Sequence, residues 1–137
     1  MCFSVTNWTT NTMKKKILVI DDNNDQLELL NDALTAEGYE VECLAHTENI
    51  YEAVRNSRAG LVIVDYILDG INGGELCHQL KITPRTSHLP VIMITGYPRV
   101  LESLGTYGAD YLLTKPFDLN ELLSVVNNFF TGKTAVA

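Results

Sequence analysis

Polar side chains directly follow several short apolar runs of the chain and, if they meet, could do phosphate chemistry. Asp21 and Asp22 follow the first run, Asp65 follows a later one, and Thr95 and Lys115 follow two more. Neighbouring carboxylates repel one another unless a cation lies among them, and hard carboxylate oxygens favour Mg²⁺. A carboxylate beside a divalent cation and a lysine can attack a phosphoryl group, because that reaction needs an aligned nucleophile and compensation of charge. The pattern predicts a magnesium-dependent acyl phosphate site.

The elements that would position these side chains are short apolar runs separated by helical patterns. Most of the runs are apolar at every position, which is typical of parallel strands covered on both faces. One run is interrupted by Glu42. The expected strands lie at residues 17–20, 41–44, 61–64, 91–94 and 111–113.

Helical patterns fill the intervals between the expected strands. One helix is indicated by leucines at i, i+3 and i+7 starting from Leu27, with Gly38 as a natural stop. Asp118, with Glu121 three residues later, predicts the capped start of a last helix. The other expected helices span residues 48–58 after a capping Thr47, 74–80 and 99–104.

This alternation of strand and helix predicts an α/β fold with a doubly wound parallel sheet. In such a sheet a site forms at the carboxyl ends of the strands, near the point where the strand order reverses. The aspartates, the threonine and the lysine all lie at such ends. We therefore expect them to converge on one edge of the sheet.

Length and composition limit the classes of function. The chain has 137 residues, of which 46% are hydrophobic and 20% charged, and this predicts one folded domain. Its formal net charge of −7 disfavours direct binding of nucleic acid. Three cysteines without a C-x-x-C pair argue against a disulfide framework or a zinc site and fit a cytoplasmic protein. No apolar run approaches the ~20 residues of a membrane-spanning helix, so no membrane partner is expected.

The two ends of the chain differ from the part between them. Residues 1–13 are rich in Thr and Asn without periodicity, and we expect a disordered or loosely ordered leader there. In an alternative interpretation Met13 is the natural start, which places residues 1–12 outside the native protein. The domain is expected over residues 14–130 and a tail over residues 131–137.

Four motifs, in their order and spacing, identify a family resemblance. They are residues 18–22 (LVIDD), 61–65 (LVIVD), 90–96 (PVIMITG) and 108–117 (GADYLLTKPF). Together they resemble the receiver domain of two-component response regulators, from about residue 15 to residue 130. The resemblance implies a five-stranded parallel sheet in the flavodoxin-like order 2-1-3-4-5, with five helices.

The resemblance also implies roles for the residues of the expected site. Asp65 would be the phosphoacceptor. Asp22 and Asp65 would bind Mg²⁺ through their side chains, with the backbone carbonyl of Ile67 as a third ligand and Asp21 acting indirectly through water. Lys115 would pair with a phosphoryl oxygen.

Thr95 and Pro116 complete the implied site. Thr95 would place its hydroxyl on a second phosphoryl oxygen, and a cis bond before Pro116 would turn the lysine into the site. The implied phosphoryl donor is a sensor histidine kinase or a histidine phosphotransfer protein, and the output is a downstream protein target. No enzyme activity beyond self-catalysed phosphotransfer and dephosphorylation is expected. The last expected helix lacks the basic residues that dimerising members of the family carry there, so a monomer is expected.

Departures from the family pattern concern switching and tuning. The family usually carries an aromatic switch residue three positions before the lysine, where this chain has Leu112. Strand alternation predicts that the neighbouring Tyr111 lies on the opposite face. The positions two beyond the phosphoacceptor and two beyond Thr95 are Ile67 and Tyr97, which are neither acidic nor amide-bearing. We expect them to exclude water and to lengthen the lifetime of the phosphorylated state.

Other interpretations compete with a stand-alone, single-domain receiver. A receiver fragment of a larger regulator or hybrid kinase would carry the same motifs. A haloacid-dehalogenase-like phosphatase needs D-x-D after its first strand and room for a cap, whereas this chain has Asp21-Asp22-Asn23 there. A flavodoxin-like electron carrier needs a phosphate loop rich in Ser, Thr and Gly, and the acidic residues at that place would repel a flavin phosphate.

Overall fold

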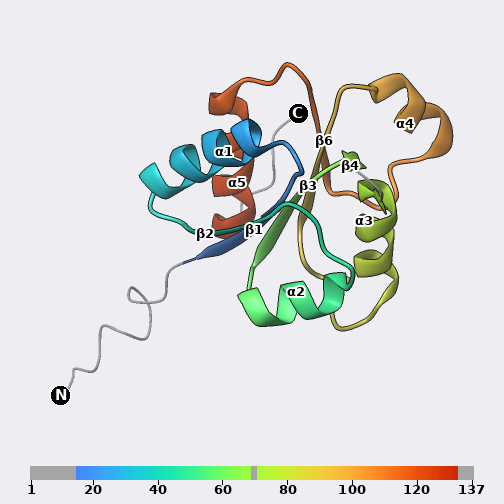
Figure 1. Ribbon diagram of the computed structural model, residues 1–137, viewed down its shortest axis with the longest axis horizontal. Coiled ribbons are helices and arrows are strands. Elements are labelled where there is room, and N and C mark those ends of the chain that lie inside the picture. The colour runs from blue at the N-terminus through green and yellow to red at the C-terminus, as the bar shows by residue number, and fades with distance from the viewer. Residues whose placement is uncertain (1–14, 69–70, 133–137) are drawn as a thin grey trace.

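The computed structural model describes residues 15–68 and 71–132 of the chain. A five-stranded parallel sheet forms its centre (Figure 1). Its strands are β1 (Lys16–Ile20), β2 (Glu40–Leu44), β3 (Leu61–Asp65), β6 (Val91–Thr95) and β7 (Tyr111–Thr114). They lie in the order β2-β1-β3-β6-β7, so the chain moves outward from β1 in both directions. The sheet is therefore doubly wound, and the predicted fold class and strand order are confirmed.

In the described part of the chain, five helices cover the two faces of this sheet. They are α1 (Asn24–Ala36), α2 (Ile50–Ser57), α3 (Gly73–Ile82), α4 (Pro98–Leu104) and α5 (Leu119–Thr131). α1 and α5 pack on one face, whereas α2, α3 and α4 pack on the other (Figure 1).

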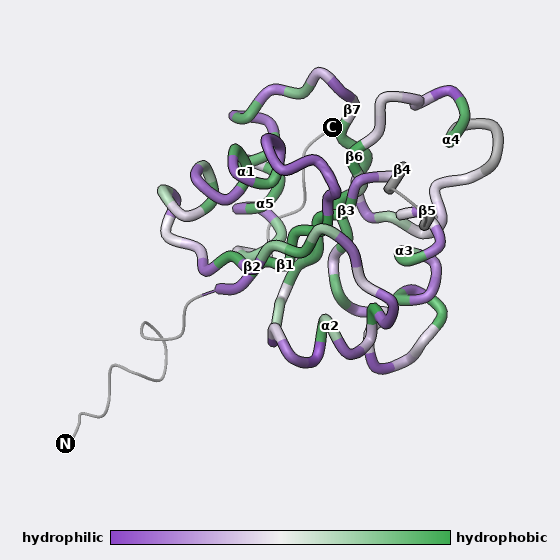
Figure 2. The backbone as a smooth tube through the Cα atoms, viewed as in Figure 1, coloured by the Kyte–Doolittle hydropathy of each residue, from purple (hydrophilic) through white to green (hydrophobic). Residues whose placement is uncertain are grey.

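Alternation of side chains along the strands divides the core into two clusters. In β1, Ile17 and Val19 belong to the cluster that includes α1 and α5. Leu18 and Ile20 belong to the cluster that includes α2, α3 and α4. Figure 2 shows the hydrophobic segments gathered in the central strands. Because β1, β3 and β6 are covered on both faces, their sequences are apolar at nearly every position.

Side chains of Asn and Asp cap the starts of several helices. Asn23 accepts a hydrogen bond from the backbone N–H of Gln26 at the start of α1 (3.0 Å), and Asp118 caps α5 as predicted. The cap expected at Thr47 is wrong, because α2 begins later, with Asn49 as its cap. Thr47 instead accepts a hydrogen bond from the N–H of Asn49 (3.2 Å) in the turn before the helix.

A second, two-stranded sheet follows β3 and was not predicted. β4 (Ile67–Leu68) pairs antiparallel with β5 (Ile71–Asn72). Strands of two residues are too short to show alternation in a sequence. Asn72 ends β5 and caps α3 by accepting a hydrogen bond from the N–H of Gly74 (2.6 Å). The small sheet thus leads directly into α3.

The described residues bear on the expected ends of the domain. α5 includes Thr131, one residue beyond the expected limit, and is followed by Gly132 in the left-handed region (φ 77°). The expected leader at residues 1–13 and most of the expected tail, residues 133–137, lie outside the described residues. Within the described ranges, none of the helices is long and apolar enough to cross a bilayer.

Candidate functional site

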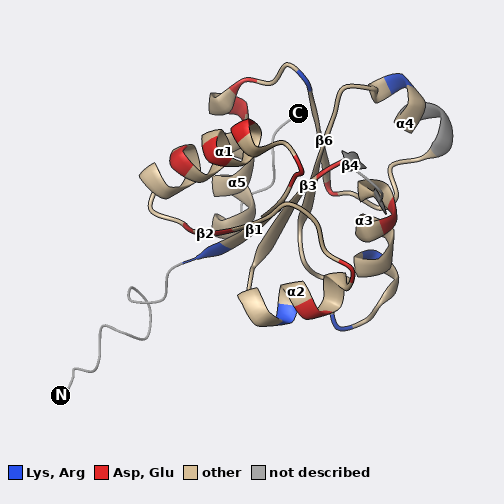
Figure 3. Ribbon diagram, in the orientation of Figure 1, with Lys and Arg blue, Asp and Glu red and all other residues tan. Residues whose placement is uncertain are grey.

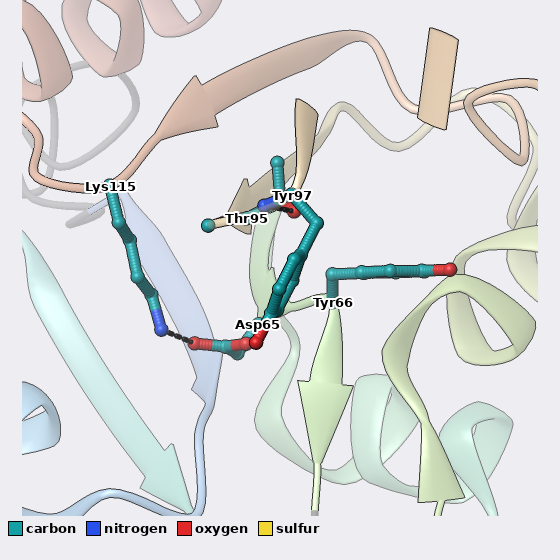
Figure 4. Close-up of a pocket in the computed structure, with 6 residues that line it drawn as sticks. Asp65, Tyr66, Thr95, Tyr97 and Lys115 are labelled. Atoms are coloured by element: carbon teal, nitrogen blue, oxygen red, sulfur yellow. Dashed lines mark hydrogen bonds and ion pairs between the residues drawn. The ribbon is translucent and has the colours of Figure 1, made fainter. Parts of the chain in front are cut away.

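The carboxyl ends of three strands bring an aspartate, a threonine and a lysine into one pocket. Asp65 ends β3, Thr95 ends β6, and Lys115 follows β7. The pocket has a volume of about 400 Å³ (Figure 4). Its lining residues are Asp65, Tyr66, Thr95, Gly96, Tyr97 and Lys115.

An ion pair joins the expected phosphoacceptor to the expected lysine. Lys115 Nζ lies 2.6 Å from Asp65 Oδ2, as the dashed line in Figure 4 marks. The Asp65 side chain is 6% exposed and that of Lys115 is 37% exposed. A buried carboxylate is unfavourable unless it is paired, and the ammonium group of Lys115 supplies that pairing for Asp65.

Thr95 and Tyr97 form the wall of the pocket at the end of β6. Thr95 is buried, and its Oγ1 accepts a hydrogen bond from the backbone N–H of Tyr97 (2.8 Å). The Tyr97 side chain is exposed and lines the same pocket as Asp65 (Figure 4). The bond between Lys115 and Pro116 is cis, as the resemblance implies.

The two acidic residues after β1 occupy different environments. Asp21 is buried, and its Oδ1 accepts a hydrogen bond from the backbone N–H of Asn23 (2.9 Å). Asp22, by contrast, is exposed. Burial raises the pKa of Asp21 and the charge of Asp65 adds to the rise, against the opposing effect of the hydrogen bond from Asn23.

Gln26 is a site residue that the sequence did not indicate. It lies in the first turn of α1, and its Nε2 donates hydrogen bonds to Asp21 Oδ2 and, over 3.2 Å, to Asp65 Oδ2. Helical side chains lean toward the N-terminus of their helix, which brings this one back over the end of β1. The sequence signal that could have identified Gln26 is its position, because it lies in the first turn of the helix that follows Asp21.

The oxygen donors at the strand ends fit a hard divalent cation. Asp21 and Asp65 both hydrogen-bond the same amide group, so their carboxylates lie close together. Among the described residues no group of three or more His, Cys, Asp or Glu side chains is arranged around a common metal position. Mg²⁺ needs fewer, because it usually binds through one or two carboxylates and keeps several waters. The donor set is therefore compatible with Mg²⁺.

Of the expected tuning and switch positions, Tyr97 lines this pocket. Ile67 is in β4, two residues beyond Asp65, whereas Tyr97 lines the pocket itself. Leu112 packs in the cluster with α2, α3 and α4, and is not among the lining residues. Tyr111 packs on the opposite face, as predicted, and its hydroxyl donates to the carboxylate of Glu121.

An aromatic contact lies beside the expected phosphoacceptor. The ring of Tyr66 is 6.0 Å from that of Tyr107, measured between centroids. Tyr107 has a left-handed backbone (φ 57°), which is uncommon for a residue other than glycine. In Figure 4 the Tyr66 side chain extends away from Lys115, toward α3. The contact links the end of β3 to the segment before β7.

Comparison with known proteins agrees with this geometry. A family model described as the response regulator receiver domain matches residues 17–127, a stretch that includes all the site residues described above. The chain belongs to this family. Receiver domains of this family act in two-component signalling together with histidine kinases.

A curated relative and two solved structures show how far the likeness extends. The phosphate regulon transcriptional regulatory protein PhoB of Rhizobium meliloti is 36% identical over 117 residues, which cover 83% of this chain and 51% of PhoB. A putative response regulator from Chloroflexus aurantiacus has a TM-score of 0.79 at 30% identity, covering 87% of this chain and 99% of that one. TrrA from Thermotoga maritima, solved in complex with Mg²⁺-BeF, has a TM-score of 0.70 at 31% identity, covering 84% and 98%. This receiver domain spans about half the length of the curated relatives that it matches.

Proposed function

We propose that this receiver domain accepts a phosphoryl group on Asp65 from a phosphohistidine of a sensor histidine kinase or a histidine phosphotransfer protein. The observation that carries the proposal is the pocket in which the buried Asp65 carboxylate lies 2.6 Å from Lys115 Nζ. A carboxylate that an ion pair holds in one position is suited to attack a phosphorus atom.

The proposed step exchanges one bond to phosphorus for another. A carboxylate oxygen of Asp65 bonds to phosphorus while the bond between phosphorus and the histidine nitrogen breaks. The electron pair of the broken bond stays on that nitrogen, which then takes a proton. Lys115 and the hydroxyl of Thr95 donate hydrogen bonds to the phosphoryl oxygens, where negative charge must be compensated.

The proposed reaction depends on Mg²⁺. Asp22 and Asp65 would hold the ion with the backbone carbonyl of Ile67, and Asp21 would act through water. The oxygen donors near Asp65 support this choice, as does the Mg²⁺-BeF complex of TrrA. When bound, Mg²⁺ supplies positive charge beside the phosphoryl oxygens.

We propose that phosphorylation alters a protein-binding surface, with no reaction on a further substrate. The hydroxyl of Thr95 now accepts a hydrogen bond from the N–H of Tyr97 (2.8 Å). Turning that hydroxyl toward a phosphoryl oxygen would remove this acceptor and free the segment that leads into α4. With Leu112 at the usual aromatic position, the change would pass through Tyr97.

Direct nucleic-acid binding by this domain is not part of the proposal. PhoB is a transcriptional regulatory protein by name, and this chain matches 51% of it. The net charge of −7 disfavours contact between the chain itself and a phosphate backbone. An output through protein contacts accords with that charge.

Phosphorylation by a small donor tests the proposal. With Mg²⁺ and acetyl phosphate, mass spectrometry should detect one added phosphoryl group that hydroxylamine removes. Asp65→Asn should abolish it, whereas Asp32→Asn, an equivalent change at an exposed position of α1, should not. Labelling of Asp65→Asn to the wild-type extent would show that the phosphoacceptor is a different residue.

The proposed metal ligand Asp22 has its own test. Asp22→Ala should weaken Mg²⁺ binding and leave the fold intact, because one carboxylate of the cluster is lost. Without metal its melting temperature should stay level or rise, since repulsion among carboxylates decreases. A fall of several degrees in the metal-free variant would contradict this account of Asp22.

A further inference from the structure

Gln26 joins carboxylates that come from two different strands of the sheet. Its Nε2 donates to Oδ2 of Asp21, which follows β1, and to Oδ2 of Asp65, at the end of β3 (3.2 Å). The position of its side chain is set by the start of α1, where the backbone N–H of Gln26 is held by Asn23 Oδ1 (3.0 Å). The amide group therefore bridges the two strand ends.

The bridge meets Asp65 at the atom that also binds the lysine. Lys115 Nζ lies 2.6 Å from Asp65 Oδ2, and Gln26 Nε2 lies 3.2 Å from the same oxygen. An amide NH₂ group carries partial positive charge on its hydrogens and only donates. It thus offsets part of the repulsion between Asp21 and Asp65, which a cation would otherwise have to offset.

We propose that Gln26 is a positioning residue that holds Asp21 and Asp65 together in the metal-free protein and competes with the divalent cation for their oxygens. The inference rests on the proposed function, since it concerns the same Mg²⁺ site. A cation near these oxygens and the NH₂ group cannot occupy one place, so binding the ion must displace the amide. Gln26 then lowers the affinity for Mg²⁺ and limits the fraction of molecules ready to react.

The test replaces the amide with an apolar side chain of similar length. Gln26→Met keeps helix propensity and removes the hydrogen bonds. Calorimetric titration with Mg²⁺ alone should show binding about threefold to tenfold tighter than wild type, since hydrogen bonds to charged groups no longer have to be broken. Without metal, the melting temperature of the variant should fall, and saturating Mg²⁺ should restore it. The matched control Gln79→Met, in α3 and away from the pocket, should change neither quantity.

Introducing a negative charge at the same position sharpens the test. Gln26→Glu adds a carboxylate to Asp21 and Asp65, so its metal-free melting temperature should be lower than that of Gln26→Met. Mg²⁺ affinity equal to or weaker than wild type in Gln26→Met would overturn the proposal, because the amide would then be neutral or helpful to the ion. If the wild type bound no Mg²⁺, the proposed metal dependence would fail by itself. The metal-free melting temperatures would still test whether Gln26 holds the two carboxylates together, because that role requires them to fall from wild type to Gln26→Met and again to Gln26→Glu.

Discussion

Asp65 and Asp21 are both buried carboxylates, but their partners differ in charge. Asp65 lies 2.6 Å from the Lys115 ammonium, a full positive charge. Asp21 accepts hydrogen bonds from neutral donors, the Asn23 N–H and the Gln26 amide. Neutral donors offset less of the cost of burying a charge, and the pKa of Asp21 is accordingly raised, chiefly by burial.

The raised pKa of Asp21 predicts how the stability of the metal-free protein depends on pH. The folded protein binds the proton of the Asp21 carboxyl group more tightly than the unfolded chain does, where this carboxyl has its ordinary pKa of 3.8. The resulting stabilisation is complete below that value and is lost as the pH rises through the raised pKa. Asp21→Asn, which does not titrate, should lack this loss, so its stability relative to wild type should increase from about pH 4 to pH 7. Thermal melts of both proteins in EDTA measure this change in relative stability. A difference between variant and wild type that stays constant across the pH range would argue against a raised pKa of Asp21.

We expect the residues two positions beyond Asp65 and Thr95 to set the lifetime of the phosphorylated state. Tyr97 lines the pocket and offers no acidic or amide group to orient an attacking water, and Ile67 offers none either. Ile67→Asn combined with Tyr97→Glu should speed self-dephosphorylation by roughly tenfold, equivalent to about 1.4 kcal/mol of barrier. Decay of the phosphorylated protein at saturating Mg²⁺ is the measurement, with Tyr97→Phe as the control. Equal lifetimes in wild type and double variant would leave water exclusion without support.

At the scale of elements, α3 starts against the backbone of Asp65. The N–H of Gly73 donates to the carbonyl of Tyr66 (2.7 Å). A Cβ at Gly73 would lie 1.8 Å from the backbone oxygen of Asp65, closer than any real contact. The absence of a side chain at this one position therefore lets α3 pack against the end of β3.

Gly73→Ala should destabilise the domain although alanine is the better helix former. Overpacking costs about 1–3 kcal/mol when side chains can adjust, and here the clash is with backbone, so we expect about 3 kcal/mol or more. Urea unfolding measures the loss. Gly96→Ala is the control, because nothing lies within 4 Å of the Cβ that it would add. Wild-type stability in Gly73→Ala would mean that α3 can move away from β3 without loss of packing.

The long strands and the charged pocket residues could be predicted from sequence, whereas several local contacts could not. Apolar runs reveal buried parallel strands, and parallel strands place their carboxyl ends at one edge, which brings Asp65 and Lys115 together. The spacing of Asp118 and Glu121 predicted the capped start of α5, but it did not indicate that the Glu121 carboxylate accepts a hydrogen bond from Tyr111 of β7. The bridge made by Gln26 likewise depends on side-chain direction in three dimensions, which residue spacing does not encode.

On the scale of the whole molecule, the excess of negative charge is spread over the surface. Figure 3 shows only acidic residues among the charged positions of α1, whereas α2 and α3 carry residues of both signs. The sequence of α5, from Leu119 to Thr131, contains no Lys or Arg. A dimer that pairs charges across this helix would lack its basic partners.

We therefore expect a monomer both before and after phosphorylation. Light scattering of the domain with and without acetyl phosphate and Mg²⁺, at low and high salt, gives the mass directly. A tight dimer of the activated form that dissociates in high salt would contradict the charge argument. The mass of a single chain under all of these conditions would agree with it.

The sheet separates two apolar clusters that share no residue. Substitutions on opposite faces should therefore be additive. Leu34→Ala in α1 should cost about 2–5 kcal/mol and Ile50→Val in α2 about 0.5–1.5 kcal/mol, and the loss of stability in the double variant should equal the sum of the two losses within about 0.5 kcal/mol. A larger coupling energy, from urea unfolding of the four proteins, would mean that strain crosses the strands. With additivity, the face that carries α2, α3 and α4 can acquire substitutions suited to a new partner while the packing of α1 and α5 is retained.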